Sequence, residues 1–273
     1  MNMNSPFENK EIQQDNIRQQ VRARYGEIAR EDQRECGPSC CSTEAATVGG
    51  TNALTLGYST SDLADAPEGA ELGLGCGNPT AIASIRTGET VVDLGSGGGF
   101  DCFVAARRVG DLGRVIGVDM TPDMITKARG NAARGGYPNV EFRLGEIEAL
   151  PVADNAADLI LSNCVINLSP DKPRVYREAF RVLKAGGRLA ISDIVALQPI
   201  PAALKADFAA YTGCVAGAAS QVDLESMLIS AGFTEVKVEV KEGSRRFIND
   251  WLPGKQAGDY VASANITARK PGI

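Results

Sequence analysis

The chain has 273 residues, seven cysteines, no histidine and a formal net charge of -6. The acidic balance argues against nucleic acid as the main partner, and no stretch reaches the roughly 20 apolar residues that a membrane-spanning helix needs. The N-terminal residues contain neither the basic nor the apolar segment of a secretory signal, so we expect a cytoplasmic, reducing location in which the cysteines are free thiols, ligands or redox groups.

The first eighty residues predict one helix followed by loops. Ile17, Val21, Tyr25 and Ile28 recur at helical spacing within residues 8–32, which predicts an amphipathic helix. The segment 36–50 contains three cysteines and is otherwise rich in small residues, so it predicts a loop. Residues 66–80 are rich in glycine and predict irregular structure.

From residue 90 the pattern changes to alternating strands and helices. The predicted strands are 90–94, 114–118, 140–144, 157–162 and 188–193, and the predicted helices are 100–109, 122–133 and 172–183. Thr121 and Pro122 form a helix-start signal, and the pair Gly186 and Gly187 forms a helix-stop signal. This alternation predicts a parallel sheet with right-handed crossovers.

The remaining residues predict two more helices and two more strands. The helices are expected at 202–211 and 223–231, with a loop around Cys214 between them, and the strands at 235–241 and 260–268. The whole is an α/β fold with a mostly parallel, seven-stranded sheet and an insertion after the fifth strand. We divide it into an N-terminal helix and loop segment (1–75), a core (76–196) and a C-terminal part (197–273).

The sequence DLGSGGG at 93–99 predicts a cofactor loop. A strand that turns sharply into a helix beside a ligand needs glycine, and Gly95, Gly97 and Gly99 provide it. Asp119 ends the next strand, where a carboxylate accepts hydrogen bonds from ribose hydroxyls. These two features alone do not separate a dinucleotide from S-adenosylmethionine.

Three further positions favour S-adenosylmethionine. Asp93 precedes the first glycine and suits a cationic amino-acid group better than a pyrophosphate, Glu146 and Ile147 offer a carboxylate and an apolar face to adenine, and Asn163 can meet the methionine end. The fold is therefore expected to be that of a Rossmann-like, class I S-adenosylmethionine methyltransferase. The candidate cofactor residues are Asp93, Gly95, Ser96, Gly97, Gly99, Asp119, Met120, Glu146, Ile147 and Asn163.

Three cysteines are expected near this loop. Cys164 follows the fourth strand at the carboxyl edge of the sheet, where ligands bind in open parallel sheets, and Cys214 lies in the insertion on the same rim. Cys76 precedes the first strand. The alternative is that each is a small buried hydrophobic residue. Without histidine, the usual proton shuttle and histidine-containing metal sites are excluded.

The other four cysteines differ in context. Cys102 is expected to face the sheet from a helix as an ordinary core residue. Cys36, Cys40 and Cys41 lie in the predicted loop, where the adjacent pair suits redox exchange or ligand delivery. A zinc site made of these three thiols and one more is an alternative, although no CxxC spacing supports it.

Several segments together resemble the bacterial arsenite S-adenosylmethionine methyltransferase family. They are VRARYG (21–26), LGLGCGNP (72–79), VDLGSGGGFDC (92–102), SNCVINLSPDK (162–172), Asp250-Trp251 and residues 260–268. The segment around Cys164 is highly specific, whereas the glycine loop alone is generic. One departure is Leu74, which stands where eukaryotic relatives tend to carry an aromatic residue; Tyr58 is a candidate replacement.

The resemblance implies arsenite and methylarsenite as substrates. It implies that Cys76, Cys164 and Cys214 bind trivalent arsenic, and that Cys41 or Cys40 supplies a further redox thiol, with Cys41 favoured. Because transfer of a methyl group oxidises arsenic, a disulfide is expected to form and to be reduced by a thiol co-substrate such as thioredoxin or glutathione.

Three other functions stay open from the residues alone. In a methyltransferase for a small organic acceptor, the cysteines would be ordinary packing residues with no chemical role. A non-catalytic protein that binds metalloid or zinc would have the same fold but would not turn over a substrate. A dinucleotide oxidoreductase is disfavoured by the acidic surroundings of the glycine loop. The oligomeric state and the number of methyl groups added do not follow from the sequence.

Overall fold

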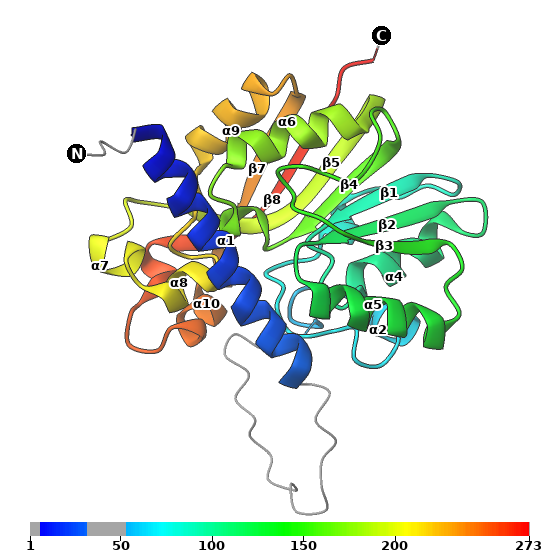
Figure 1. The fold of residues 1–273 in the computed structure, drawn as a ribbon, viewed down its shortest axis with the longest axis horizontal. Coiled ribbons are helices and arrows are strands. Elements are labelled where there is room, and N and C mark those ends of the chain that lie inside the picture. The colour runs from blue at the N-terminus through cyan, green and yellow to red at the C-terminus, as the bar shows by residue number, and fades with distance from the viewer. Residues whose placement is uncertain (1–5, 32–52, 273) are drawn as a thin grey trace, which may run out of the picture.

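A computed structural model describes residues 6–31 and 53–272 of the chain, and its centre is one eight-stranded sheet with helices on both faces (Figure 1). The strand order is β3-β2-β1-β4-β5-β8-β7, with the short β6 paired to β5. The pairs among β1 to β6 are parallel, and β8 is antiparallel to both β5 and β7. The strands are β1 (Thr90–Leu94), β2 (Arg114–Asp119), β3 (Val140–Leu144), β4 (Ala157–Asn163), β5 (Leu183–Ala196), β6 (Ala219–Ser220), β7 (Thr234–Lys241) and β8 (Val261–Arg269).

The helices divide between the two faces of the sheet. Figure 1 shows α6 and α9 on one face and α4 and α5 on the other, while α1 runs across the molecule in front of the sheet. The α-helices are α1 (Pro6–Glu31), α2 (Thr60–Asp65), α3 (Pro79–Ile82), α4 (Phe100–Val109), α5 (Pro122–Gly135), α6 (Lys172–Val182), α7 (Ala202–Lys205), α8 (Phe208–Thr212), α9 (Gln221–Ser230) and α10 (Arg245–Trp251). Short 3₁₀ helices cover Ile166–Leu168, Glu242–Ser244 and Ala257–Asp259. No helix in the described ranges is both long and apolar enough to span a bilayer.

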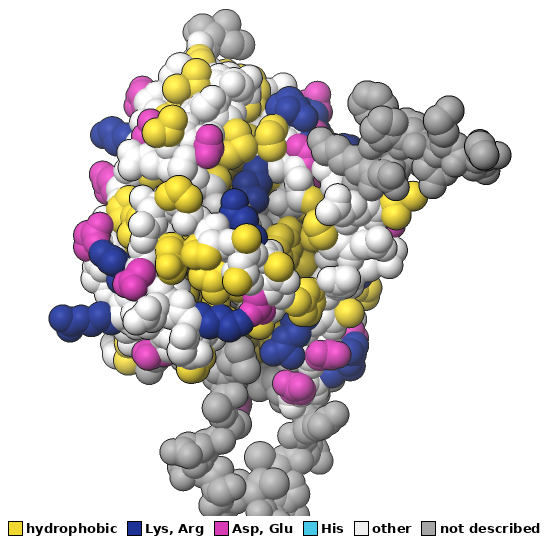
Figure 2. Space-filling model, turned by 90° about the vertical axis from the view of Figure 1, so that its left-hand side faces the viewer, with side chains coloured by type: hydrophobic (Ala, Val, Ile, Leu, Met, Phe, Trp, Pro, Cys, Tyr) yellow, Lys and Arg dark blue, Asp and Glu magenta, His cyan; other side chains and the backbone are white. Residues whose placement is uncertain are grey.

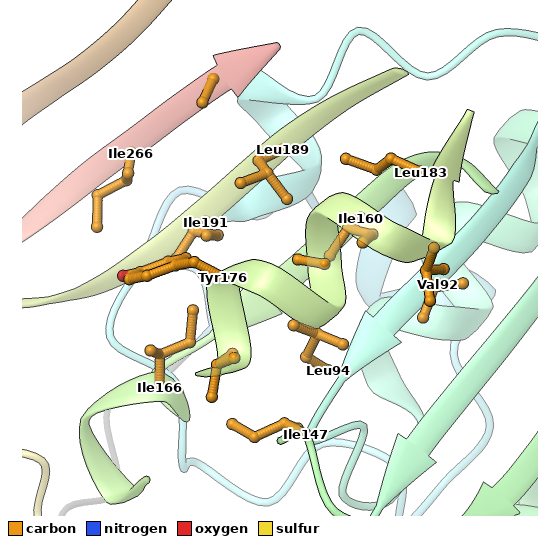
Figure 3. Close-up of a cluster of buried hydrophobic side chains, with 14 of the residues drawn as sticks. Val92, Leu94, Ile147, Ile160, Ile166, Tyr176, Leu183, Leu189, Ile191 and Ile266 are labelled. Atoms are coloured by element: carbon orange, nitrogen blue, oxygen red, sulfur yellow. The ribbon is translucent and has the colours of Figure 1, made fainter. Parts of the chain in front are cut away.

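The core lies between the sheet and its helices. One cluster packs β1, β4 and β5 against α6, and Figure 3 shows the ring of Tyr176 of α6 between Ile191 and Ile166. A second cluster packs α4 and α5 against the other face. β1 and β4 are buried along most of their length, as expected for parallel strands that helices cover on both faces. The carboxyl ends of β1, β2 and β4 are thereby fixed at one edge.

The predicted strands and main helices are confirmed. The structure adds β6, which makes the sheet eight-stranded where seven strands were predicted, and the short helices α2 and α10. Three further details differ. The helix predicted to stop at Gly186 and Gly187 ends at Val182, and the glycine pair lies in β5, where the register with β4 shifts. Glycine in a strand commonly marks such a bulge. The predicted helix 202–211 is two short helices, because Asp207 accepts hydrogen bonds from two backbone N–H groups and caps α8. Residues 66–80, predicted as irregular, end at α3, which Asn78 caps.

Candidate active site

The glycine loop joins β1 to α4 beside the end of β2. Gly95, Gly97 and Gly99 have φ values of 68°, 50° and 96°, which residues with a Cβ rarely adopt. A Cβ on Gly95 would lie 2.4 Å from the Val165 side chain, so the loop also needs glycine for close packing. The Asp119 carboxylate accepts a hydrogen bond from the backbone N–H of Gly97 at 3.0 Å, which fixes the loop against β2.

A cavity of about 1100 Å³ opens at this edge of the sheet. Its walls come from the glycine loop, the ends of β2 and β4, the segment after β3 and one side of α1. The predicted cofactor residues that line it are Gly95, Ser96, Gly97, Asp119, Met120, Ile147 and Asn163. Tyr58, Leu74, Asp101 and Cys164 line it as well, so Tyr58 and Leu74 share one cavity.

Three predicted cofactor residues lie outside this lining. Asp93 is 3% exposed beneath the loop and accepts a hydrogen bond from the Cys102 thiol at 3.2 Å. Gly99 begins α4, where a Cβ would lie 2.7 Å from Phe142. Glu146 forms ion pairs with Arg18 and Arg22 of α1, so its carboxylate is already partnered.

The cavity wall presents polar groups to a ligand. The Ser96 hydroxyl is buried and has no hydrogen-bond partner among the described residues. The Asp119 carboxylate accepts hydrogen bonds from the N–H groups of Gly97 and Thr121, yet burial raises its pKa. Because a buried polar group without a partner is costly, Ser96 indicates a ligand with complementary polar atoms.

A hydrogen-bonded network connects the cavity to Cys76. The Asn163 amide donates to the Tyr58 hydroxyl at 3.1 Å and to the Asp101 carboxylate at 3.2 Å, and its oxygen accepts from the Cys76 N–H at 3.1 Å. Tyr58 donates to Asp101 at 2.6 Å. Burial raises the pKa of Asp101 to about 6. The sequence did not indicate Tyr58 and Asp101 as a pair, since 43 residues separate them.

Three thiols come close together behind this network. Cys76, Cys164 and Cys214 are 1%, 5% and 2% exposed. The Cys214 thiol donates to the Cys164 carbonyl oxygen at 2.9 Å. Cys164 and Cys214 have φ values of 59° and 62°, and such strained backbone at non-glycine residues is concentrated at functional sites.

The thiol environment disfavours the free thiolate. Hydrogen bonds with Cys214 and Cys76 raise the pKa of Cys164 well above its usual value, with burial adding to the effect. Burial raises the pKa of Cys76 as well. A ligand that bonds to sulfur directly would displace these protons on binding.

Asp193 is a residue that the sequence did not single out. Its carboxylate oxygen and the sulfurs of Cys76 and Cys164 lie within 4.8 Å of one another, and it is 3% exposed. The strand pattern was predicted to end at Asp193, whereas β5 continues to Ala196. The aspartate therefore stands inside a strand and faces the thiols.

A second cavity reaches two of these thiols. It measures about 1090 Å³ and contacts Cys164 and Cys214, with walls from α1, α8 and α10. Figure 2 views the side of the molecule that carries α7, α8 and α10, where hydrophobic side chains gather. Tyr25 of α1 lines both cavities and donates to the Thr212 carbonyl oxygen at 3.1 Å.

The remaining predicted thiols have different positions. Cys102 is fully buried on α4, as expected for a core residue. Cys36, Cys40 and Cys41 lie outside the described residues. The four described cysteines are unpaired, which agrees with the expectation of free thiols.

Comparisons with known proteins identify the family. A methyltransferase domain model matches residues 85–232. An arsenite methyltransferase from Halobacterium salinarum is 51% identical over 263 residues, which are 93% of this chain and 66% of that protein. A ubiquinone/menaquinone biosynthesis C-methyltransferase from Enterobacter is 35% identical over 48% of this chain and 51% of its own length. This chain therefore spans less than two thirds of each of these two relatives.

Solved structures agree with this result. The crystal structure of an arsenic(III) S-adenosylmethionine methyltransferase from Chlamydomonas reinhardtii matches with a TM-score of 0.62 and 35% identity, covering 78% of this chain and 73% of that one. The glycine loop and the cavity lie at the carboxyl ends of the strands, where ligands bind in open α/β sheets. The chain belongs to the arsenite S-adenosylmethionine methyltransferase family, within the proteins that carry this methyltransferase domain.

Proposed function

We propose that the protein transfers methyl groups from S-adenosylmethionine to trivalent arsenic, giving methylated arsenicals. The observation that carries the proposal is the set of three buried cysteines, Cys76, Cys164 and Cys214, that meet beside the cavity at the end of β4. Similarity to the Halobacterium and Chlamydomonas proteins supports the same substrate.

The first cavity suits S-adenosylmethionine. Ser96 offers a buried hydroxyl that lacks a partner, and Asp119 offers a carboxylate at the end of β2, the position of ribose-binding acids in this type of sheet. Gly97 has no atom within 4 Å of where a Cβ would stand, so a ligand can approach its backbone closely. When bound, the sulfonium compound supplies an electrophilic methyl group.

The protein's contribution is mainly to position the reactants. Three thiolates hold arsenic(III) with its lone pair free, so the lone pair can form the new As–C bond and no general base is needed. Asn163 fixes the backbone of Cys76 to the wall of the cavity, which keeps the arsenic site and the donor site in register. Correct alignment of two reactants can supply several kcal/mol of the barrier reduction, about 7–11 in favourable cases.

A redox step must close the cycle. Methyl transfer takes arsenic from the +3 to the +5 state; two thiolates then give up an electron pair, form a disulfide and return arsenic to +3. A dithiol or glutathione-type reductant, thioredoxin included, restores the thiols. Cys41, or Cys40, is proposed as a further redox thiol, and a reducing cytoplasm suits the four unpaired cysteines.

The test is turnover with product analysis. Purified protein is incubated with arsenite, S-adenosylmethionine and a dithiol, and arsenic species and S-adenosylhomocysteine are quantified over time. One S-adenosylhomocysteine per methyl group on arsenic supports the proposal, and the ratio of methylated forms gives the end product. If a quinone-type acceptor is methylated and arsenite is not, the proposal is wrong and the methyl acceptor is of the kind named for the similar C-methyltransferase.

A further inference from the structure

The Asp193 carboxylate is part of the thiol cluster. The donor atoms of Cys76, Cys164 and Asp193 all lie within 4.8 Å of one another, and all three residues are buried. Three converging donor atoms, two sulfurs and a carboxylate oxygen, from distant parts of the chain have the spacing of a cation site. Trivalent arsenic does not need the carboxylate as a ligand, because three thiolates and its own lone pair complete its coordination.

Hydrogen bonds hold the Asp193 carboxylate in place. Its Oδ1 accepts from the Asn167 amide at 2.9 Å and from the Ile194 N–H at 2.8 Å, and its Oδ2 accepts from the Ile166 N–H at 3.0 Å. A carboxylate oxygen has two lone pairs, so Oδ2 keeps one for a cation. Metal-binding carboxylates are commonly oriented by hydrogen bonds of this kind.

We propose that Cys76, Cys164 and Asp193 form a binding site for a thiophilic divalent cation of the zinc type. Thiolate and carboxylate are both zinc ligands, and Zn²⁺ takes four donors in a tetrahedral arrangement. Binding displaces the two thiol protons to solvent and leaves a fourth position for water. The Cys214 thiol donates a hydrogen bond to the Cys164 carbonyl oxygen, and Cys214 is not one of the three clustered donors.

This site differs from the proposed arsenic site in one donor. Cys76 and Cys164 belong to both sites. The third donor is Asp193 for the cation and Cys214 for arsenic. The two ligands therefore compete, and zinc inhibits methylation of arsenic if the proposed function is correct. Cation binding itself does not depend on that function.

The test is a zinc titration of the reduced, metal-free full-length chain in competition with a chromogenic chelator. We expect Asp193→Asn to weaken zinc at least about tenfold, the scale on which even the outer partners of metal ligands act. Cys214→Ser and the core control Cys102→Ser are expected to keep wild-type zinc affinity. Arsenite should show the opposite pattern, with affinity lost in Cys214→Ser and retained in Asp193→Asn.

Cobalt(II) provides an independent readout, because thiolate-to-cobalt absorption reports sulfur ligands. Cys76→Ser and Cys164→Ser are each expected to reduce this absorption. If Asp193→Asn does not fold, these two variants test whether both thiols bind the cation. Unchanged zinc affinity in folded Asp193→Asn overturns the proposal. The proposal is also overturned if zinc affinity is lost only in the variant in which Cys36, Cys40 and Cys41 are all replaced by serine. If the zinc pattern holds and no arsenic is methylated, the cation site stands and the proposed function fails.

Discussion

The side-chain oxygen of Asn163 accepts a hydrogen bond from the backbone N–H of Cys76 at 3.1 Å, across 87 residues of sequence. The same amide donates to the Gly77 carbonyl oxygen at 2.9 Å and reaches Tyr58 and Asp101 in the first cavity. One side chain at the end of β4 therefore joins the segment that carries a thiol to the wall of the proposed donor site.

Replacing Asn163 by alanine is expected to weaken both sites. The Cys76 N–H loses its acceptor, and an unsatisfied buried donor costs about 1–3 kcal/mol. Arsenite affinity and affinity for S-adenosylmethionine should both fall in Asn163→Ala, as measured by calorimetry. The control Tyr58→Phe keeps the bond to Cys76, so its effect should be confined to S-adenosylmethionine. Equal loss of arsenite affinity in the two variants would refute this role for Asn163.

Serine at Cys164 or Cys214 is expected to abolish arsenic methylation. A hydroxyl does not replace a thiolate toward arsenic, and even small misplacements of reacting groups can cost about 100-fold in rate. Initial rates should fall at least that far while S-adenosylmethionine still binds. Cys102→Ser is the matched control, because Cys102 is buried outside the cluster and a serine can keep the hydrogen bond to Asp93. Full activity in either site variant contradicts the mechanism.

Asp101 should make stability depend on pH. Burial raises its pKa to about 6 in the folded protein, above the ordinary value of 3.8, so the folded state binds the proton more tightly. Its contribution to stability is present below pH 4 and is lost as pH rises through 6. The pKa difference corresponds to at most about 3 kcal/mol. Urea unfolding should therefore show Asp101→Asn gaining stability relative to wild type between pH 4 and 7, and a constant difference would contradict this.

Arg18 is expected to fasten α1 over the first cavity. Its guanidinium pairs with Glu146 at 3.5 Å and with the buried Glu148 at 3.4 Å. Arg18→Ala should cost about 2 kcal/mol, the scale of hydrogen bonds to charged groups, and should speed amide hydrogen exchange in α1. Arg24 is the control, because it pairs with Glu27 on the same helix, and such exposed pairs contribute under about 1 kcal/mol. Equal exchange in the two variants would show that the Arg18 pairs do not hold α1.

Local patterns explain why much of the fold could be predicted. Thr90–Leu94 contains a short apolar run and Val140–Leu144 alternates apolar and charged residues, and both patterns predict strands. Helix α4 starts at the glycine loop. The pair Gly186 and Gly187 was misread because glycine both ends helices and forms strand bulges, and only pairing with β4 decides between the two.

The details of the site depend on contacts distant in sequence. Glu146 stays a predicted adenine contact, and the ion pairs that its carboxylate forms with arginines of α1, more than 120 residues away, could not be predicted. Asp193 looked like the end of a strand, and its position beside two thiols follows from the pairing of β5 with β8 through Ala196. Such relationships leave no periodic signal in the sequence.

Binding of arsenic by Cys76, Cys164 and Cys214 is tested most directly by X-ray absorption at the arsenic K edge, on the reduced protein with one equivalent of arsenite. Three sulfur neighbours around arsenic are expected in the wild type and in Asp193→Asn, with one sulfur lost in Cys214→Ser. Oxygen neighbours in the wild type, or a sulfur count that Cys214→Ser leaves unchanged, would contradict this set of ligands.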